Sequence, residues 1–159
     1  MLAVRNVAID EIIPYENNPR RIRPEAVKAV AASIREFGFK VPVVIDEDRV
    51  IVTGHTRVLA ARELGMHEVP CIVADDLTPE QIKAFRLADN KASELTNWDF
   101  DRLEVELEEL SDIEIDMSAF GFPQDMESTA DSFENKEISS EEYSVDKFKH
   151  ECPVCGFKF

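Results

Sequence analysis

The sequence is short of cysteine and of long apolar runs, and these shortages exclude several kinds of protein. Three cysteines in 159 residues cannot build the disulfide framework of a small secreted domain. No apolar stretch approaches the roughly 20 residues needed to cross a bilayer. The N-terminus also lacks the basic segment and hydrophobic core that direct secretion. We therefore expect a cytoplasmic protein that does not contact membranes.

Basic residues are scarce as well, since 18 Lys and Arg face 33 Asp and Glu and give a formal net charge of −15. The imbalance is uneven: residues 1–74 carry ten residues of each sign, whereas residues 75–120 carry four basic and 14 acidic ones. Binding to duplex DNA needs a basic face, and no basic recognition helix is visible. We expect DNA contact to be weak or indirect and interpret the acidic half as a solvated helical surface.

Changes in sequence character predict four parts. Residues 1–76 alternate short β-branched stretches with helical patterns, which is typical of a small α/β domain. Residues 77–120 form a helical extension whose two amphipathic helices we expect to fold back onto that domain. Residues 121–146 are polar, acidic and aperiodic, which indicates a flexible linker. Residues 147–159 form a separate tail.

Capping residues mark where the helices begin and end. Pro24 stands at the first position of a helix that Gly38 ends. Thr78-Pro-Glu-Gln81 is a capping box that begins another helix. Strands are expected over residues 2–8, 41–45, 50–52 and 69–74. The expected buried faces of the two later helices are Ile82, Phe85, Ala88, Ala92 and Leu95 in one, and Phe100, Leu103, Leu107 and Leu110 in the other.

The most informative segment runs from Val50 to Gly65 and contains the turn Thr53-Gly-His-Thr-Arg57 between an apolar stretch and an amphipathic helix. A helix that begins directly after a glycine leaves unpaired N–H groups at its positive dipole end, where anions bind. Arg57 adds planar donors that match phosphate oxygens. The turn predicts a phosphate-binding site, with an ordinary strand-to-helix turn as the alternative.

Four motifs in the same order resemble those of the ParB/sulfiredoxin-like superfamily. They lie within residues 4–73 and are Ile13-Pro-Tyr-Glu-Asn-Asn-Pro-Arg20, Ala32-Ser-Ile-Arg-Glu-Phe-Gly38 followed by Val41-Pro-Val-Val-Ile45, Thr53-Gly-His-Thr-Arg57, and Gly65 with Val69-Pro70. The resemblance implies a small mixed-sheet α/β fold that binds a nucleoside triphosphate, with Mg²⁺, at the turn before the long helix. It implies Gly54, His55, Thr56 and Arg57 as phosphate-binding residues, with Arg20 nearby.

Position 55 separates this chain from two branches of that superfamily. Partition proteins that hydrolyse CTP usually have Glu-Arg where this chain has His55 and Thr56. A neutral histidine does not supply the negative ligand that Mg²⁺ prefers, so hydrolysis by that route is not expected. Sulfiredoxins need a cysteine at this position, which excludes sulfinic-acid reduction. Phosphate contact and a helix-capping or packing role remain open for His55.

Glu16 is a candidate catalytic residue. Kinase-like relatives carry Gly-His-His-Arg with an upstream Pro-x-Glu, which Pro14-Tyr-Glu16 resembles. Within hydrogen-bond reach of a hydroxyl acceptor, this carboxylate is suited to act as a general base. The alternative is a solvated loop carboxylate.

The helix after the α/β domain carries a further likeness. Residues 86–99 resemble the segment that follows the ParB-like domain in phage and mobile-element proteins, some of which continue into a DNA methyltransferase. In partition proteins an equivalent helix brings an Asn and an Arg toward the nucleotide, which implies Asn90 with Arg86 or Lys91 here. A plain surface helix is the alternative. This chain has no methyltransferase cofactor motif, so we do not expect it to methylate DNA itself.

The tail carries Cys152 and Cys155 at CxxC spacing, with His150 just before them. This pattern is typical of a zinc knuckle, although structural Zn²⁺ takes four ligands and the site is incomplete. A second copy of the chain or another protein is a possible source of the missing ligand. No ligand at all and redox chemistry are the alternatives, but no helix follows Cys155 to lower a thiol pKa.

The leading hypothesis is a nucleotide-binding protein, with hydrolysis open, in a DNA-associated process such as partition, phage DNA modification or transcription regulation. One alternative is a non-catalytic scaffold that binds a DNA methyltransferase or another phage or plasmid protein. A homodimer and a monomer both remain open. The other is a small-molecule phosphotransferase that uses Glu16. A metal-dependent nuclease is not expected, because the sequence shows no cluster of metal-binding carboxylates.

Overall fold

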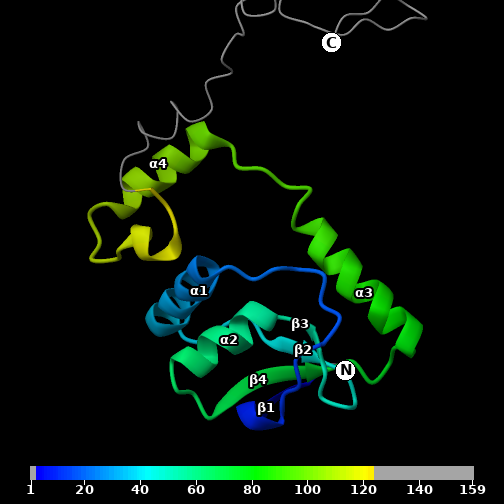
Figure 1. Ribbon diagram of the computed structural model, residues 1–159. Coiled ribbons are helices and arrows are strands. Elements are labelled where there is room, and N and C mark those ends of the chain that lie inside the picture. The colour runs from blue at the N-terminus through cyan, green and yellow to red at the C-terminus, as the bar shows by residue number, and fades with distance from the viewer. Residues whose placement is uncertain (1–2, 124–159) are drawn as a thin grey trace, which may run out of the picture. The chain divides into compact units, whose positions relative to one another are not determined.

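A four-stranded mixed sheet is the centre of the computed structural model, which describes residues 3–123 (Figure 1). The strand order is β1-β4-β2-β3. β1 pairs antiparallel with β4, β4 runs parallel to β2, and β2 pairs antiparallel with β3. The strands are β1 (Val4–Ala8), β2 (Val43–Ile45), β3 (Ile51–Thr53) and β4 (Glu68–Val73). The α/β class and the mixed sheet are confirmed.

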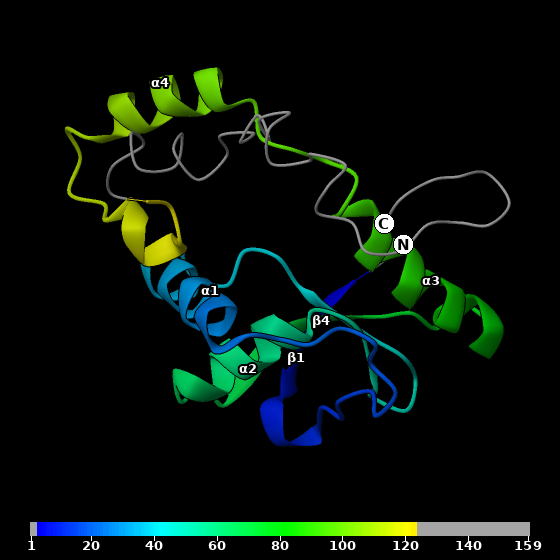
Figure 2. The ribbon, with the colours of Figure 1, turned by 45° about the horizontal axis from the view of Figure 1, so that its top comes forward.

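The helices follow the predicted order along the chain. They are α1 (Pro24–Phe37), α2 (His55–Glu63), α3 (Pro79–Ala92) and α4 (Phe100–Leu110), with short 3-10 turns η1 (Ile9–Glu11) and η2 (Met117–Phe120). α1 and α2 lie side by side in both ribbon views (Figure 2), and α3 contacts the outer strand β3. The core lies between α2 and the sheet and is made of Ile9, Ile12, Val43, Ile45, Ile51, Val58, Ala61, Val69 and Cys71.

Local sequence signals set the helix ends as expected. Gly38 has φ +77° and ends α1 with a hydrogen bond from its N–H to the carbonyl of Ile34. Thr78 and Gln81 form the predicted capping box, in which each side chain accepts from the other residue's N–H. Such caps satisfy N–H groups that a helix leaves unpaired, so they fix its first turn.

The buried face of α3 differs from the prediction. Ile82 is buried as expected, but the other buried residue is Arg86, one turn further on. Phe85 is 38% exposed, and Leu95 lies beyond the helix end and is 72% exposed. The reason is that α3 contacts the sheet mainly at β3, so a narrow stripe at four-residue spacing is covered.

The second helical face agrees better with the prediction. Leu103, Leu107 and Leu110 are half-buried and line a pocket of about 370 Å³ with Met117 and Phe122, although Phe100 is 52% exposed. Two aromatic contacts accompany them: Trp98 with Phe122 at 5.8 Å and Phe37 of α1 with Phe120 at 5.5 Å between ring centroids. The second contact joins η2 to α1.

Within residues 3–123, no helix is both long enough and apolar enough to span a membrane. The predicted zinc ligands His150, Cys152 and Cys155 and nearly all of the predicted linker lie outside the described residues.

Candidate functional site

The predicted phosphate turn joins β3 to α2. Gly54 has φ +101°, a left-handed conformation that favours glycine, and it is the N-cap of α2. No side chain caps this helix, so the N–H groups of its first turn have no partner from a cap within the described residues. A Cβ added at Gly54 would stand 3.4 Å from Cζ of Arg57 and 3.4 Å from Cγ2 of Val43. The backbone therefore passes close to the guanidinium group.

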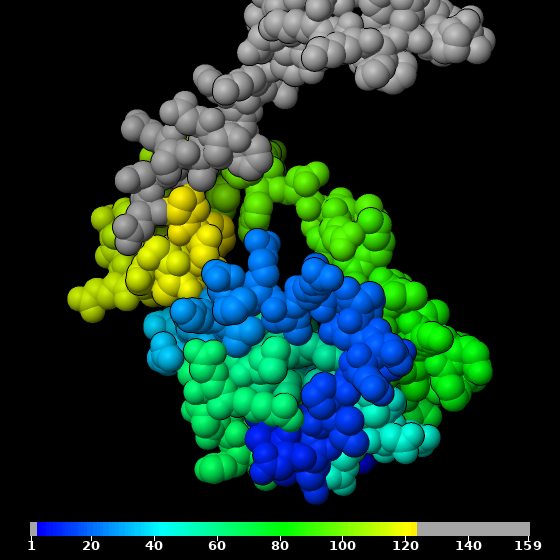
Figure 3. All heavy atoms as spheres, in the orientation of Figure 1, coloured from blue at the N-terminus to red at the C-terminus, as the bar shows by residue number. Residues whose placement is uncertain are grey.

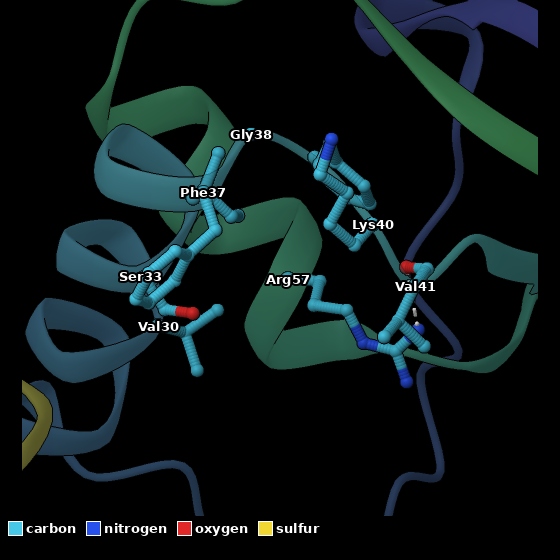
Figure 4. A pocket seen from close by; sticks show the side chains of 9 residues that line it. Val30, Ser33, Phe37, Gly38, Lys40, Val41 and Arg57 are labelled. Atoms are coloured by element: carbon cyan, nitrogen blue, oxygen red, sulfur yellow. Dashed lines mark hydrogen bonds between the residues drawn. The ribbon is translucent and has the colours of Figure 1, made fainter.

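Arg57 ties α2 to the segment that leads into β2. Its Nη1 donates to the carbonyl of Val41 at 3.0 Å (Figure 4), and it also donates to the carbonyl of Pro42. Burial lowers the pKa of Arg57, and the nearby charge of Asp89 opposes this effect. An arginine pKa stays far above neutrality, so the guanidinium remains a cation. Phosphate binding by Arg57 stays a prediction, and the structure adds a second role in joining two elements.

His55 is the first residue of α2 and is half-buried. Its Nε2 accepts a hydrogen bond from the N–H of Tyr15 at 3.3 Å. Burial lowers the pKa of His55 below its ordinary value of 6.5, and the positive charge of Arg86 lowers it further. The imidazole is therefore neutral at pH 7.

Arg86 of α3 is buried, so its guanidinium is not free at the surface. Its Nε donates to the carbonyl of Ile51 at 3.1 Å, and its Nη2 pairs with Oδ2 of Asp46 at 3.2 Å. Its Cζ lies 3.9 Å from the ring centroid of Tyr15, a cation–π contact. The sequence interpretation missed Tyr15 and Asp46. The burial of Arg86 could have been predicted from its position four residues after Ile82, because residues at this spacing share one face of a helix.

Two predicted residues that lie 70 positions apart come together at the surface. Nη1 of Arg20 donates to Oδ1 of Asn90 at 3.4 Å, and Nδ2 of Asn90 donates to the carbonyl of Arg86 at 2.8 Å. Lys91, the alternative candidate, instead pairs with Glu94 in solvent. The loop before α1 thus bridges α2 and α3, as the space-filling view also shows (Figure 3).

Glu16 follows the residue whose N–H binds His55. It lies in an exposed turn, and within residues 3–123 its side chain has no hydrogen bond or ion pair. The structure places it near the phosphate turn through its neighbour Tyr15, and its catalytic role stays a prediction. The described residues also contain no group of three or more His, Cys, Asp or Glu side chains that could hold a metal ion.

A pocket of about 550 Å³ opens beside Arg57 (Figure 4). Its charged members are Arg57 and Lys40, and the rest of its lining is mostly apolar: Val30, Ser33, Ile34, Phe37, Gly38, Phe39 and Val41. A mostly apolar lining with two cations suits a ligand that has both an apolar ring and an anionic group.

The ParB N-terminal domain family matches residues 1–91, more than half of the chain, and the protein belongs to this family. The superfamily predicted from the four motifs is thereby confirmed. The chain is 45% identical over 73 residues to the ParB-like nuclease domain-containing protein YnaK of Escherichia coli, a match that covers 46% of this chain and 84% of YnaK.

Longer proteins are also similar to this chain. It is 30% identical over 94 residues to the probable chromosome-partitioning protein ParB of Rickettsia prowazekii, which covers 58% of this chain but 33% of that protein. The crystal structure of C-terminally truncated ParB from Caulobacter crescentus, complexed with CTP-gamma-S, superposes with a TM-score of 0.61 at 22% identity, over 69% of this chain and 63% of that one. This likeness shows a shared fold.

Proposed function

We propose that this protein binds a nucleoside triphosphate at the turn from Gly54 to Arg57 and acts in a DNA-associated process such as partition. The observation that carries the proposal is the uncapped first turn of α2, which begins at a left-handed glycine and has the Arg57 guanidinium beside it. Main-chain N–H groups, the helix dipole and an arginine together form a binding site for phosphate.

The relatives support a nucleotide as the ligand and DNA as the setting. The Caulobacter ParB structure is a complex with CTP-gamma-S, and the Rickettsia relative is a probable chromosome-partitioning protein. Because this chain spans one third of the latter, the activities of those whole proteins come to it only as proposals.

In this arrangement each group has a defined task. The first-turn N–H groups of α2 bind phosphate oxygens, and Arg57 and Arg20 neutralise their charge. The pocket beside Arg57 takes the apolar part of the nucleotide. Mg²⁺ is commonly held by phosphate oxygens and one or two carboxylates, and Glu16 is the exposed carboxylate next to Tyr15. When bound, Mg²⁺ supplies further charge neutralisation.

Nucleotide binding is tested with ATP, CTP and GTP in the presence of Mg²⁺, by calorimetry on the full chain. We expect Arg57→Ala to weaken binding about tenfold or more, since a hydrogen bond to a charged group is lost. Its matched control is Arg35→Ala, which removes an exposed arginine from the last turn of α1.

A glycine pair tests the turn itself. Gly54→Ala places a methyl group against Arg57 and strains a left-handed backbone, so we expect it to weaken binding. Gly65→Ala has a similarly positive φ of +68° but nothing within 4 Å of the added carbon. It therefore reports the backbone strain alone. No binding of any nucleotide by the wild type, or equal affinities in the two glycine variants, contradicts the proposal.

Phosphate release then separates the finer functions. Binding without turnover makes the protein a nucleotide-dependent switch. Turnover that needs an added hydroxyl acceptor, and is lost in Glu16→Ala while nucleotide binding with Mg²⁺ persists, identifies the phosphotransferase that the sequence left open. The methyltransferase partner of the scaffold alternative stays a prediction, because no methyltransferase is among the relatives described above.

A further inference from the structure

The imidazole of His55 meets a main-chain donor on one side. Its Nε2 accepts the hydrogen bond from the N–H of Tyr15 at 3.3 Å. A ring nitrogen that accepts a hydrogen bond carries no proton, so the single proton of the neutral ring is on Nδ1. The contact therefore selects one of the two neutral tautomers.

The donor is held firmly in place. The ring of Tyr15 lies against the guanidinium of Arg86, at 3.9 Å between Cζ and the ring centroid. Arg86 is itself buried and bound to Ile51 and Asp46. A main-chain N–H has no rotamers, so unlike a hydroxyl it cannot turn to become an acceptor. The main chain of Tyr15 can therefore only donate a hydrogen bond to Nε2 of His55 and cannot accept one from it.

The other ring nitrogen is left for a ligand. Across residues 3–123, Nδ1 of His55 has no hydrogen-bond partner. His55 also opens α2, so its side chain begins at the uncapped end of that helix. We propose that His55 offers its Nδ1–H to the bound phosphate as a neutral hydrogen-bond donor, in the tautomer that Tyr15 selects as a positioning residue. This inference rests on the proposed function, because the anion is the phosphate of the nucleotide.

The charges around His55 favour a neutral ring. Arg86, on α3, is the charged group that acts on it, and its effect on the pKa of His55 adds to that of burial. Arg57 is directed to the carbonyls of Val41 and Pro42, and the charge of Asp89 acts on Arg57. Tyr15 contributes its main chain and Glu16 is exposed. A second cation beside Arg86 is disfavoured, so the ring is neutral when it meets the phosphate.

The tautomer is measured first, without any ligand. Nitrogen-15 NMR spectra of the imidazoles in the full chain distinguish the two neutral forms, and the signals of His55 are those lost in His55→Gln. We expect the form protonated at Nδ1 at pH 7.5. We also expect a mixture of both forms in Tyr15→Pro, which lacks the N–H, but not in Tyr15→Ala, which lacks the ring and keeps the N–H. A wild-type ring protonated at Nε2, or at both nitrogens, overturns the proposal.

Affinity for CTP with Mg²⁺ is measured next on two substitutions. The amide nitrogen of Asn takes the place of Nδ1, whereas the end of a Gln side chain takes the place of Nε2. We expect His55→Asn to bind within about threefold of the wild type and His55→Gln to bind tenfold more weakly or worse. The ratio of wild-type to His55→Asn affinity stays constant from pH 8 to pH 7, because the pKa of His55 lies below 6.5 and neither side chain becomes charged in that range.

The outcomes separate the inference from the proposed function. Equal losses in the two variants, or a wild-type advantage over His55→Asn that grows as the pH falls, overturn the neutral donor while nucleotide binding stands. If the wild type binds no nucleotide, the proposed function and the donor role fail together, and the spectrum still decides whether Tyr15 selects the tautomer.

Discussion

His55 shows how much a single residue depends on its surroundings. On the sequence it is a polar residue after a glycine, equally suited to cap a helix or to bind phosphate. In the folded protein it is half-buried, bound through Nε2 to the N–H of Tyr15, and within the electrostatic reach of Arg86. These neighbours lower its pKa and occupy Nε2, and Nδ1 has no hydrogen-bond partner within residues 3–123.

The lowered pKa of His55 predicts a pH dependence of stability. Its pKa in the folded state lies below the ordinary 6.5, so at mildly acid pH the unfolded chain binds a proton more readily. The contribution of His55 to the free energy of unfolding is complete above pH 6.5 and is lost as the pH falls through and below that value. Urea denaturation at intervals from pH 8 to pH 5 measures it.

His55→Gln is the control, because glutamine keeps a hydrogen-bond acceptor and does not titrate. We expect the wild type to lose more stability than this variant over that range. The many carboxyl groups of the chain titrate in both proteins, so they change both free energies of unfolding alike. Curves of stability against pH that stay parallel therefore contradict the prediction.

At the scale of elements, α3 depends on Arg86 for its attachment to the sheet. One guanidinium joins the helix to the carbonyl of Ile51 in β3, to Asp46 in the turn before it, and to the ring of Tyr15. A buried arginine with partners on three segments holds those segments in one arrangement, whereas Ile82 is the one apolar residue of α3 that is buried.

Replacement of Arg86 by Met is expected to lower the free energy of unfolding by about 3 kcal/mol, because it leaves the carboxylate of Asp46 nearly buried without its cation. Chemical denaturation measures the change. In a double-mutant cycle with Asp46→Asn, the two losses sum to more than the loss in the double variant. Lys91→Met is the matched control, since its ion pair with Glu94 is exposed and its loss leaves stability unchanged within error. Additive losses contradict the coupling.

For the whole molecule, the distribution of charge matters more than its sum. The matched family covers residues 1–91, while all of the acidic excess lies beyond residue 74. The candidate site lies in the charge-balanced part, together with the arginines that phosphate binding requires. The acidic remainder opposes direct contact with a DNA backbone, which is consistent with DNA as the setting of the function and not as the ligand of this surface.

The predicted zinc knuckle lies outside the described residues, so it is tested on the full chain. We expect purified protein to contain about one zinc per chain, or one per dimer if two copies share the site. Metal analysis of the purified protein measures it, and Cys152→Ser removes the metal.

Cys71→Ala is the control for that loss. Cys71 is buried in β4, and burial raises the pKa of its thiol to about 11, which disfavours the thiolate that binds metal. Zinc that persists in Cys152→Ser, or is absent from the wild type, contradicts the knuckle.

The sequence by itself determined the order of strands and helices, where α1 and α3 begin, and the turn at Gly54. These features are local: a proline opens α1, a left-handed glycine ends it, and a capping box begins α3. The motif order also determined the family. Apolar periodicity failed on α3, because the buried stripe of a helix depends on what covers it.

Only the tertiary structure decided which distant side chains meet. The contact of Tyr15 with His55, the burial of Arg86 beside Asp46, and the hydrogen bond from Arg20 to Asn90 join residues 40 to 70 positions apart. Such pairs follow from how α2, α3 and the loop before α1 pack together, and no local preference encodes that packing. The sequence therefore located the turn at Gly54, and the packing around it placed Tyr15 and Arg86 next to its histidine.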